Sequence, residues 1–446
     1  MLYDKKLASF TENGKTTTLM ALALPLFIQS LTVHFIGTGN VLVVSNYSSV
    51  LVTVTSVTNQ IINLGNSILS AVAAGMAIMV SVSFGAKNRD KAARESGAAV
   101  TTAFALGVLT ALAIFILANP LISLMNLTGP TSVMAVRYLK GKAINLLITV
   151  ITGVFSRTFI CNGHSKPVVI TSLLSSGISV AISYLFFYVV KSSIDDITFL
   201  IIKDICIALL HLVALVLLLK PYKIALKIKF GIRDGAKMLR LGIPVAMCSI
   251  SFSMANTITT GFVAEMGEHV INAKAYINDI FNYVPLFCYS VSTAHSIITG
   301  RYRGARDFGS IKKLFKQDVL LSVLVNGGLS LLILIFHKPL MSMFTRDENI
   351  INLLKWVFII DLPLEISRAV NNLSENTLNP CGDVAATFLT SVIACWAFGV
   401  GVAYLFCVTL NGGLTGLWLA FLLNELFKTG AYLLRWRSGK WKNAKV

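Results

Sequence analysis

Three charged side chains lie inside one otherwise apolar stretch, residues 350–376, at the spacing of an α-helix. Asp361 and Glu365 are four residues apart and Glu365 and Arg368 are three apart, so a helix places all three on one face. Two neighbouring carboxylates strengthen each other's affinity for a proton, whereas an arginine weakens it. We interpret Asp361 and Glu365 as candidate groups for a coupling proton or a transient sodium ion. The alternative is that Glu365 and Arg368 form an ion pair that only locks the helix.

A second polar group occurs twice, as NQIIN at residues 59–63 and NDIFN at residues 278–282. Asn59, Gln60, Asn278 and Asp279 offer amide and carboxylate oxygens to a bound cation, and we predict that they line a substrate cavity. Asp279 carries a charge and is therefore a third candidate for the coupling ion. The alternative for the amides is hydrogen bonding between helices, which is common in membrane bundles.

The two motifs are 219 residues apart, and the same offset pairs other landmarks of the chain. The pairs are Leu24-Pro25 with Ile243-Pro244, Gly85-Ala86 with Gly304-Ala305, Gly163 with Gly382, and Thr171-Ser172 with Thr390-Ser391. Matches without an intervening insertion indicate a duplicated chain of roughly 220 residues per copy. We expect the two copies to have one fold.

Composition shows what kind of elements must position these residues. Of the 446 residues 55% are hydrophobic and 13% charged, and the mean hydropathy is +0.75. Because a spanning helix needs about 20 mostly apolar residues, the chain has room for about twelve between residues 19 and 434. We predict an all-α polytopic membrane protein with two six-helix bundles. The most uniformly apolar segments, 168–190 and 197–219, are expected to face lipid.

The net charge of +18 is concentrated in particular turns. Basic residues gather at 85–95, 221–237, 301–307 and 435–442. In a polytopic protein such clusters mark cytoplasmic loops, so we expect both termini in the cytoplasm, an inner-membrane location and no nucleic-acid partner. The predicted divisions are a first bundle at 1–220, a basic linker at 221–237, a second bundle at 238–434 and a basic cytoplasmic tail at 435–446.

Several motifs together resemble one transporter family. They are LALP (22–25), SNYS (45–48), NQI (59–61), FGAKN (84–88), LGIP (241–244), RYRGARD (301–307), CGD (381–383), GLTGLWLAF (413–421), RWRSGKW (435–441) and the ExxRxxN pattern of Glu365, Arg368 and Asn371. In this order the chain resembles the multidrug and toxic compound extrusion (MATE) transporters, in particular the bacterial Firmicutes-type branch. The resemblance implies two bundles related by an axis along the membrane normal, and a cavity between them that opens alternately to each side. It also implies that Arg368 and Asn371 line that cavity.

Three positions depart from that family, namely Asn40, Asn379 before the CGD turn and Asn424 beside Glu425. The helix 1 aspartate that prokaryotic members commonly use for the coupling ion corresponds to Asn40, whose amide cannot titrate. Asn40 therefore remains a candidate for the substrate cavity, and ion coupling through the first bundle is in doubt.

The resemblance implies an antiporter that exports amphipathic, cationic small molecules and is driven by protons or sodium ions. We expect it to act as a monomer without a cofactor or a resident metal. One alternative is a flippase for lipid-linked sugars, whose cavity would need Arg or Lys for a pyrophosphate, whereas the interior charges here are mixed. Another is an uncoupled relative with a binding or regulatory role, which the Asn40 position motivates. A membrane enzyme would need a nucleophile–base set or metal motif, and the scattered histidines supply neither.

Overall fold

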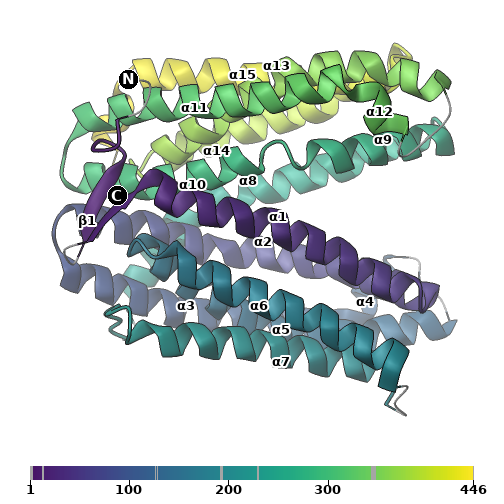
Figure 1. The fold of residues 1–446 in the computed structure, drawn as a ribbon, viewed down its shortest axis with the longest axis horizontal. Helices are drawn as coiled ribbons and strands as arrows, with labels where there is room; N and C mark the ends of the chain where they lie inside the picture. The colour runs from purple at the N-terminus through teal and green to yellow at the C-terminus, as the bar shows by residue number, and fades with distance from the viewer. Residues whose placement is uncertain are drawn as a thin grey trace. The chain divides into compact units, whose positions relative to one another are not determined.

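The computed structural model describes residues 4–12, 15–125, 127, 129–190, 194–228, 231–342 and 348–444. Helices account for most of these residues (Figure 1). The helical elements are α1 (Leu19–Ser45), α2 (Ser49–Gly85), α3 (Arg89–Ile116), α4 (Ala118–Ser123), α5 (Gly129–Cys161), α6 (Ser165–Tyr184), η1 (Leu185–Val190), α7 (Asp196–Leu219), α8 (Ile232–Ala264), α9 (Glu268–Phe281), α10 (Leu286–Gly304), α11 (Phe308–Ile335), α12 (His337–Ser342), α13 (Glu348–Leu378), α14 (Val384–Ile393), η2 (Ala394–Val402), η3 (Leu405–Thr409), α15 (Gly413–Arg437) and η4 (Lys440–Asn443).

The chain forms two compact units. The N-terminal unit contains Ile28–Ser83 and Asn88–Ala246, and the C-terminal unit contains Met1–Phe27, Phe84–Lys87 and Met247–Val446. The division falls inside α1 and α8, close to Pro25 and Pro244. The boundaries that we drew from the sequence at 220, 237 and 434 stay a prediction.

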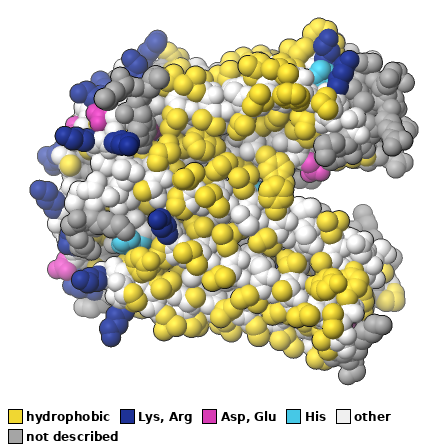
Figure 2. Space-filling view, viewed as in Figure 1, with side chains coloured by type: hydrophobic (Ala, Val, Ile, Leu, Met, Phe, Trp, Pro, Cys, Tyr) yellow, Lys and Arg dark blue, Asp and Glu magenta, His cyan; other side chains and the backbone are white. Residues whose placement is uncertain are grey.

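In the described part of the chain, ten helical segments are long and apolar enough to cross a membrane. The predicted all-α polytopic class is therefore confirmed. Large apolar side chains are exposed along these segments, as expected of surfaces that contact lipid. In Figure 2 the hydrophobic surface covers the length of the helices, and most Lys and Arg side chains gather at the left of the view.

One predicted helix is wrong. The apolar content of residues 272–300 predicts one continuous helix, but α9 ends at Phe281 and α10 begins at Leu286. Pro285 stands directly before α10. Because proline lacks a backbone N–H and disfavours helical geometry in the residue before it, the helix ends and starts again at this point.

The backbone repeats the sequence duplication in detail. Lys87 has a φ of 57°, and Arg306, which is 219 residues later, has a φ of 58°. Gly163 and Gly382, with the same separation, have φ values of 88° and 91°. Left-handed geometry is uncommon in residues other than glycine, so its recurrence at matched positions supports one fold for both copies.

Matched residues also cap matched helices. The side chain of Asn88 accepts a hydrogen bond from the backbone N–H of Lys91 (3.0 Å) at the start of α3. Asp307 accepts one from the backbone N–H of Ser310 (2.9 Å) at the start of α11. A side-chain oxygen at this position satisfies one of the N–H groups left free at a helix start.

We expect Asp307→Ala and Asn88→Ala each to lower the free energy of unfolding by about 1 kcal/mol. Their pH dependence should differ. Hydrogen bonds from the side chain and backbone of Ser310 lower the pKa of Asp307, so its stabilisation is complete at neutral pH and is lost as the pH falls through that pKa. Thermal denaturation in detergent between pH 7 and about pH 3 checks this. An Asn88→Ala loss that also vanished in acid would contradict it, because an amide does not titrate.

The chain begins with a short hairpin that the sequence analysis did not predict. Strands β1 (Ser9–Glu12) and β2 (Lys15–Thr18) pair antiparallel, with Ser9 opposite Thr18. The Tyr302 hydroxyl donates to the carbonyl of Leu7 (2.7 Å), and the Arg301 guanidinium lies 3.8 Å from the centroid of the Phe10 ring. The hairpin is therefore packed on the end of α10 in the C-terminal unit.

The end of the chain is also folded into this unit. The Trp441 side chain is fully buried, in a cluster with Ile311, Leu378, Cys381 and Tyr432. The Arg303 guanidinium donates to the carbonyls of Lys442 (2.9 Å) and Ala444 (2.7 Å). The segment that we predicted as a basic tail is thus packed against the helices as far as residue 444.

Candidate functional site

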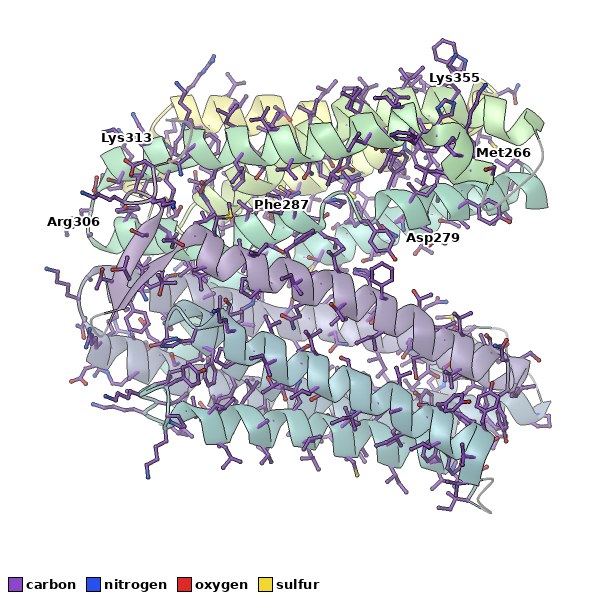
Figure 3. All side chains as sticks on the ribbon, in the orientation of Figure 1. Met266, Asp279, Phe287, Arg306, Lys313 and Lys355 are labelled. Carbon is purple, nitrogen blue, oxygen red and sulfur yellow. The ribbon has the colours of Figure 1, made fainter. Side chains whose placement is uncertain are left out.

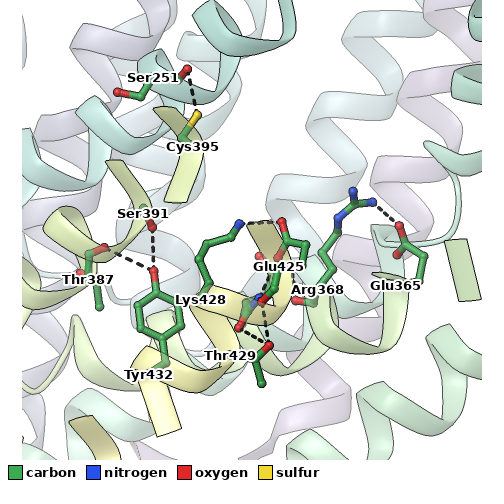
Figure 4. Close-up of polar contacts among 12 residues, drawn as sticks. Ser251, Glu365, Arg368, Thr387, Ser391, Cys395, Glu425, Lys428, Thr429 and Tyr432 are labelled. Carbon is green, nitrogen blue, oxygen red and sulfur yellow. Dashed lines mark hydrogen bonds and ion pairs between the residues drawn. The ribbon is translucent and has the colours of Figure 1, made fainter. Parts of the chain in front are cut away.

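The predicted charged face of the helix forms on α13. Asp361 and Glu365 are 2% and 0% exposed. One Glu365 carboxylate oxygen accepts from the Arg368 guanidinium, and the other accepts from the Asn326 amide of α11 at the long distance of 3.5 Å. Figure 4 shows the pair of Glu365 and Arg368. The side chain of Arg368 is 25% exposed, so the pair has one fully buried member and one that reaches the surface of the unit.

Asp361 lies one turn before Glu365 and is less well satisfied. Its Oδ1 accepts from the Trp418 indole N–H (3.3 Å), whereas its Oδ2 has no hydrogen-bond partner among the described residues. An ionised carboxylate without a partner is costly in a low-dielectric interior. A proton or a metal cation on this oxygen would neutralise the buried charge. Asp361 and Glu365 together thus offer one carboxylate held by Arg368 and one available to an exchangeable ion.

Asn371 lies on the same helix but is bound to α15. Its amide donates to both the backbone carbonyl (2.8 Å) and the carboxylate (2.7 Å) of Glu425, and its oxygen accepts from Thr429 (2.9 Å). Residues three apart share a helix face, and Glu425 pairs with Lys428 (2.6 Å) as this spacing predicts (Figure 4). Asn371 is buried and uses both ends of its amide inside the protein, which indicates a role in joining α13 to α15.

A stripe of buried polar side chains that sequence reasoning missed extends from this site along α11. Asp318, Ser322, Asn326 and Ser330 recur every four residues and are at most 2% exposed. On a helix this spacing places them on one face. Asn326 contacts Glu365 at one end. The regular spacing is visible in the sequence and could have predicted the stripe.

Asp318 pairs with a fully buried histidine of α10. His295 Nδ1 lies 2.7 Å from Asp318 Oδ2, and His295 Nε2 lies 2.8 Å from Thr377 Oγ1. The Thr377 hydroxyl also lies 2.6 Å from the carbonyl of Leu373. If it donates to that carbonyl it accepts from Nε2, and the contact between Nδ1 and Oδ2 then holds a second proton, on an imidazolium or a carboxylic acid; if it donates to Nε2, a neutral imidazole donates from Nδ1 to Asp318.

The other candidate residues do not join this cluster. Asp279 lies on α9 and is exposed (Figure 3), whereas the buried face of that helix is formed by Ala273, Ile277 and Phe281. Asn278, beside it, is half-buried. The sequence analysis did not name Lys274, which is buried on the same helix. Its ammonium donates to the Thr260 hydroxyl (2.7 Å).

Three candidates lie in the N-terminal unit. Asn59 and Gln60 are exposed on α2. Asn40 is half-buried on α1, and its side-chain oxygen accepts from the Ser183 hydroxyl of α6 (3.3 Å). That Asn59 and Gln60 line a substrate cavity stays a prediction, and Asn40 already has a partner in the protein.

Comparisons with known proteins agree on one family. The MatE family profile matches residues 25–185 and 244–405, one match in each repeat. The uncharacterized transporter YisQ of Bacillus subtilis is 25% identical over 433 residues, which cover 96% of this chain and 95% of that protein. The probable multidrug resistance protein NorM of Thermotoga maritima is 23% identical over 444 residues, with 96% and 93% covered.

Solved structures show the same fold. A mutant of the Vibrio cholerae MATE transporter VcmN superposes with a TM-score of 0.87 at 15% identity, covering 95% of this chain and 98% of that chain. A MOP superfamily transporter from Pyrococcus furiosus gives a TM-score of 0.84 at 16% identity, with 95% and 96% covered. Because the profile matches both repeats over most of the sequence, the chain belongs to the MatE family of multi-pass membrane transporters, which are not enzymes.

Proposed function

We propose that this protein is a secondary-active antiporter that exports amphipathic, cationic small molecules and is driven by a proton or sodium gradient. The observation that carries the proposal is the buried set on α13, where Asp361 keeps a carboxylate oxygen without a partner beside the pair of Glu365 and Arg368. We assign the coupling ion to Asp361 and Glu365 in the C-terminal unit. Transport then proceeds by alternating access between two bundles of a monomer that has both termini in the cytoplasm.

The polar stripe of α11 supports ion exchange at this place. At one end of it Asn326 contacts Glu365, and at the other Asp318 pairs with His295 of α10. Hydrogen-bonding groups buried in a row provide partners for water or for a moving proton. Names of relatives support the substrate class, since proteins such as NorM of Thermotoga maritima are described as probable multidrug resistance proteins.

The test is ethidium export from proteoliposomes under an imposed pH gradient and, separately, an imposed sodium gradient. We expect one of the two gradients to drive export against the ethidium gradient. If neither does, the same vesicles should be loaded with a fluorescent lipid-linked sugar. Movement of that lipid without a gradient would favour the flippase alternative, and movement of neither compound would favour an uncoupled relative.

Asp279 supplies a smaller, separate prediction. Because it is exposed on α9 and carries a charge, we propose that it contacts the cationic substrate. Losing one charged contact costs about 1 kcal/mol, so Asp279→Asn should raise the KM for ethidium by roughly fivefold with little change in kcat. Initial rates over a range of ethidium concentrations measure both constants. An unchanged KM would remove Asp279 from the substrate site, and Glu265→Gln, an exposed carboxylate beyond the end of α8, is the matched control.

A further inference from the structure

One helix that the sequence predicted to face lipid buries a charged side chain. α7 exposes apolar residues such as Leu209 and Val213, but the side chain of Lys203 is only 3% exposed. Its ammonium donates to the Ser183 hydroxyl of α6 (2.9 Å) and lies 3.5 Å from Asp204 Oδ1. A buried ammonium is costly unless its charge is compensated.

Compensation is incomplete because two lysines share one carboxylate. The Lys142 ammonium of α5 lies 2.7 Å from Asp204 Oδ2, which also accepts from the Tyr138 hydroxyl (3.0 Å). The carboxylate therefore binds Lys142 more closely than it binds Lys203. Lys142 is also more exposed, at 18% of its side chain. One positive charge remains in excess, and it falls on Lys203.

The remaining neighbours of Lys203 suit both the charged and the neutral amine. From α6 it meets Ser183, whose hydroxyl also contacts the Asn40 oxygen of α1. Neither of these residues is charged, so within the described ranges the titratable groups around Lys203 are Lys142 and Tyr138 of α5 and Asp204 of α7. A hydroxyl can accept from an ammonium and donate to a neutral amine. After loss of a proton, the Ser183 hydroxyl can turn from the Ser179 carbonyl (3.0 Å) and the Asn40 oxygen to donate to the neutral amine.

We propose that Lys203 is a proton-exchanging site of the N-terminal unit. On release, an Nζ–H bond breaks, the proton passes to water, and the electron pair stays on Nζ, where it accepts a hydrogen bond from the Ser183 hydroxyl. The exchange removes the excess charge from the cluster of Lys203, Asp204 and Lys142. This site goes beyond the proposed function, which places the coupling ion on α13. The N-terminal unit has Asn40 where the resemblance predicts an acid, and Lys203 would let this unit respond to pH in another way.

The test counts protons and needs no substrate. Purified protein in detergent is titrated from about pH 9 to about pH 6, a range in which ordinary lysines stay charged. We expect Lys203→Met and Lys203→Arg to take up one proton per chain fewer than the wild type in this range. Lys220→Met, which removes an exposed lysine beyond the end of the same helix, is expected to match the wild type.

A third variant covers the case in which Lys203 variants do not fold. Lys142→Met removes the competing ammonium and leaves Lys203 and Asp204 as a neutral pair, so Lys203 should keep its proton across the range. This variant is also expected to take up one proton fewer. Wild-type proton uptake in Lys203→Arg or in Lys142→Met would overturn the proposal, whatever the outcome of the ethidium experiment.

Discussion

Glu365→Gln is expected to abolish gradient-driven ethidium export while leaving the protein folded. The substitution keeps the shape of the side chain and one oxygen that can accept from Arg368, and the new amide N–H can donate to the Asn326 oxygen. It removes the charge that a coupling ion would balance. Because the amide cannot balance a coupling ion, we expect driven export to fall by roughly a hundredfold, which corresponds to about 3 kcal/mol in activation free energy. Initial rates of efflux under the effective gradient, with melting temperatures of the same samples, give both quantities.

The structure offers a matched control on the same helix. Glu375 also lies on α13, is half-buried, and is outside the pair of Glu365 and Arg368. Glu375→Gln should therefore retain most of the driven export. If Glu365→Gln kept wild-type export against the ethidium gradient, Glu365 and Arg368 would be an ion pair that only locks α13, which was the alternative interpretation of their spacing.

Spacing within one helix was enough to predict part of this site. Because residues three and four apart share a helix face, the sequence placed Asp361, Glu365 and Arg368 together, and the structure does the same. The partners of these residues lie on other helices. Periodicity shows which side of a helix is polar but not which neighbouring helix it meets, so the contacts of Glu365 with Asn326 and of Asp361 with Trp418 needed the fold.

The same limit explains the residues that were missed. In segment 197–219 the high apolar content predicted contact with lipid, but composition could not show that Lys203 and Asp204 face Lys142 on α5. The sequence analysis named no partner for His295. Its partner Asp318 is 23 residues away, on the next helix, where no local pattern connects the two.

The break between α9 and α10 and the N-terminal hairpin could both have been predicted from the local sequence. Pro285 inside the predicted helix 272–300 marks the break between α9 and α10. The dipeptide Asn13-Gly14, between SFTE and KTTT, is a strong hairpin signal and stands between β1 and β2. The high hydropathy of the rest of the chain led us to predict helices throughout, so the hairpin was missed. The spans themselves were predicted well because the length and apolar content required by a bilayer leave little choice.

The buried position of Trp441 predicts a large loss of stability when this side chain is removed. Its ring stacks on Trp436 at 4.5 Å with an interplanar angle of 3°, and its indole N–H donates to the Trp436 carbonyl (3.1 Å). The ring edge also packs on Phe308 of α11. We expect this end of the chain to lie in water rather than lipid. Burial of the indole therefore gains the full hydrophobic contribution, which helices packed within lipid do not gain from one another.

Trp441→Ala should consequently lower the free energy of unfolding of the C-terminal unit by about 3–5 kcal/mol. At about 2–4 °C per kcal/mol for a unit of this size, the melting temperature in detergent should fall clearly. Trp441→Phe should lose less, because it keeps an aromatic ring against Trp436. Lys440→Ala changes an exposed neighbour and should have no such effect. A Trp441→Ala melting temperature equal to that of Lys440→Ala would mean that the end of the chain is not part of the folded unit. The docking of Arg303 on the carbonyls of Lys442 and Ala444 would then contribute nothing to stability either.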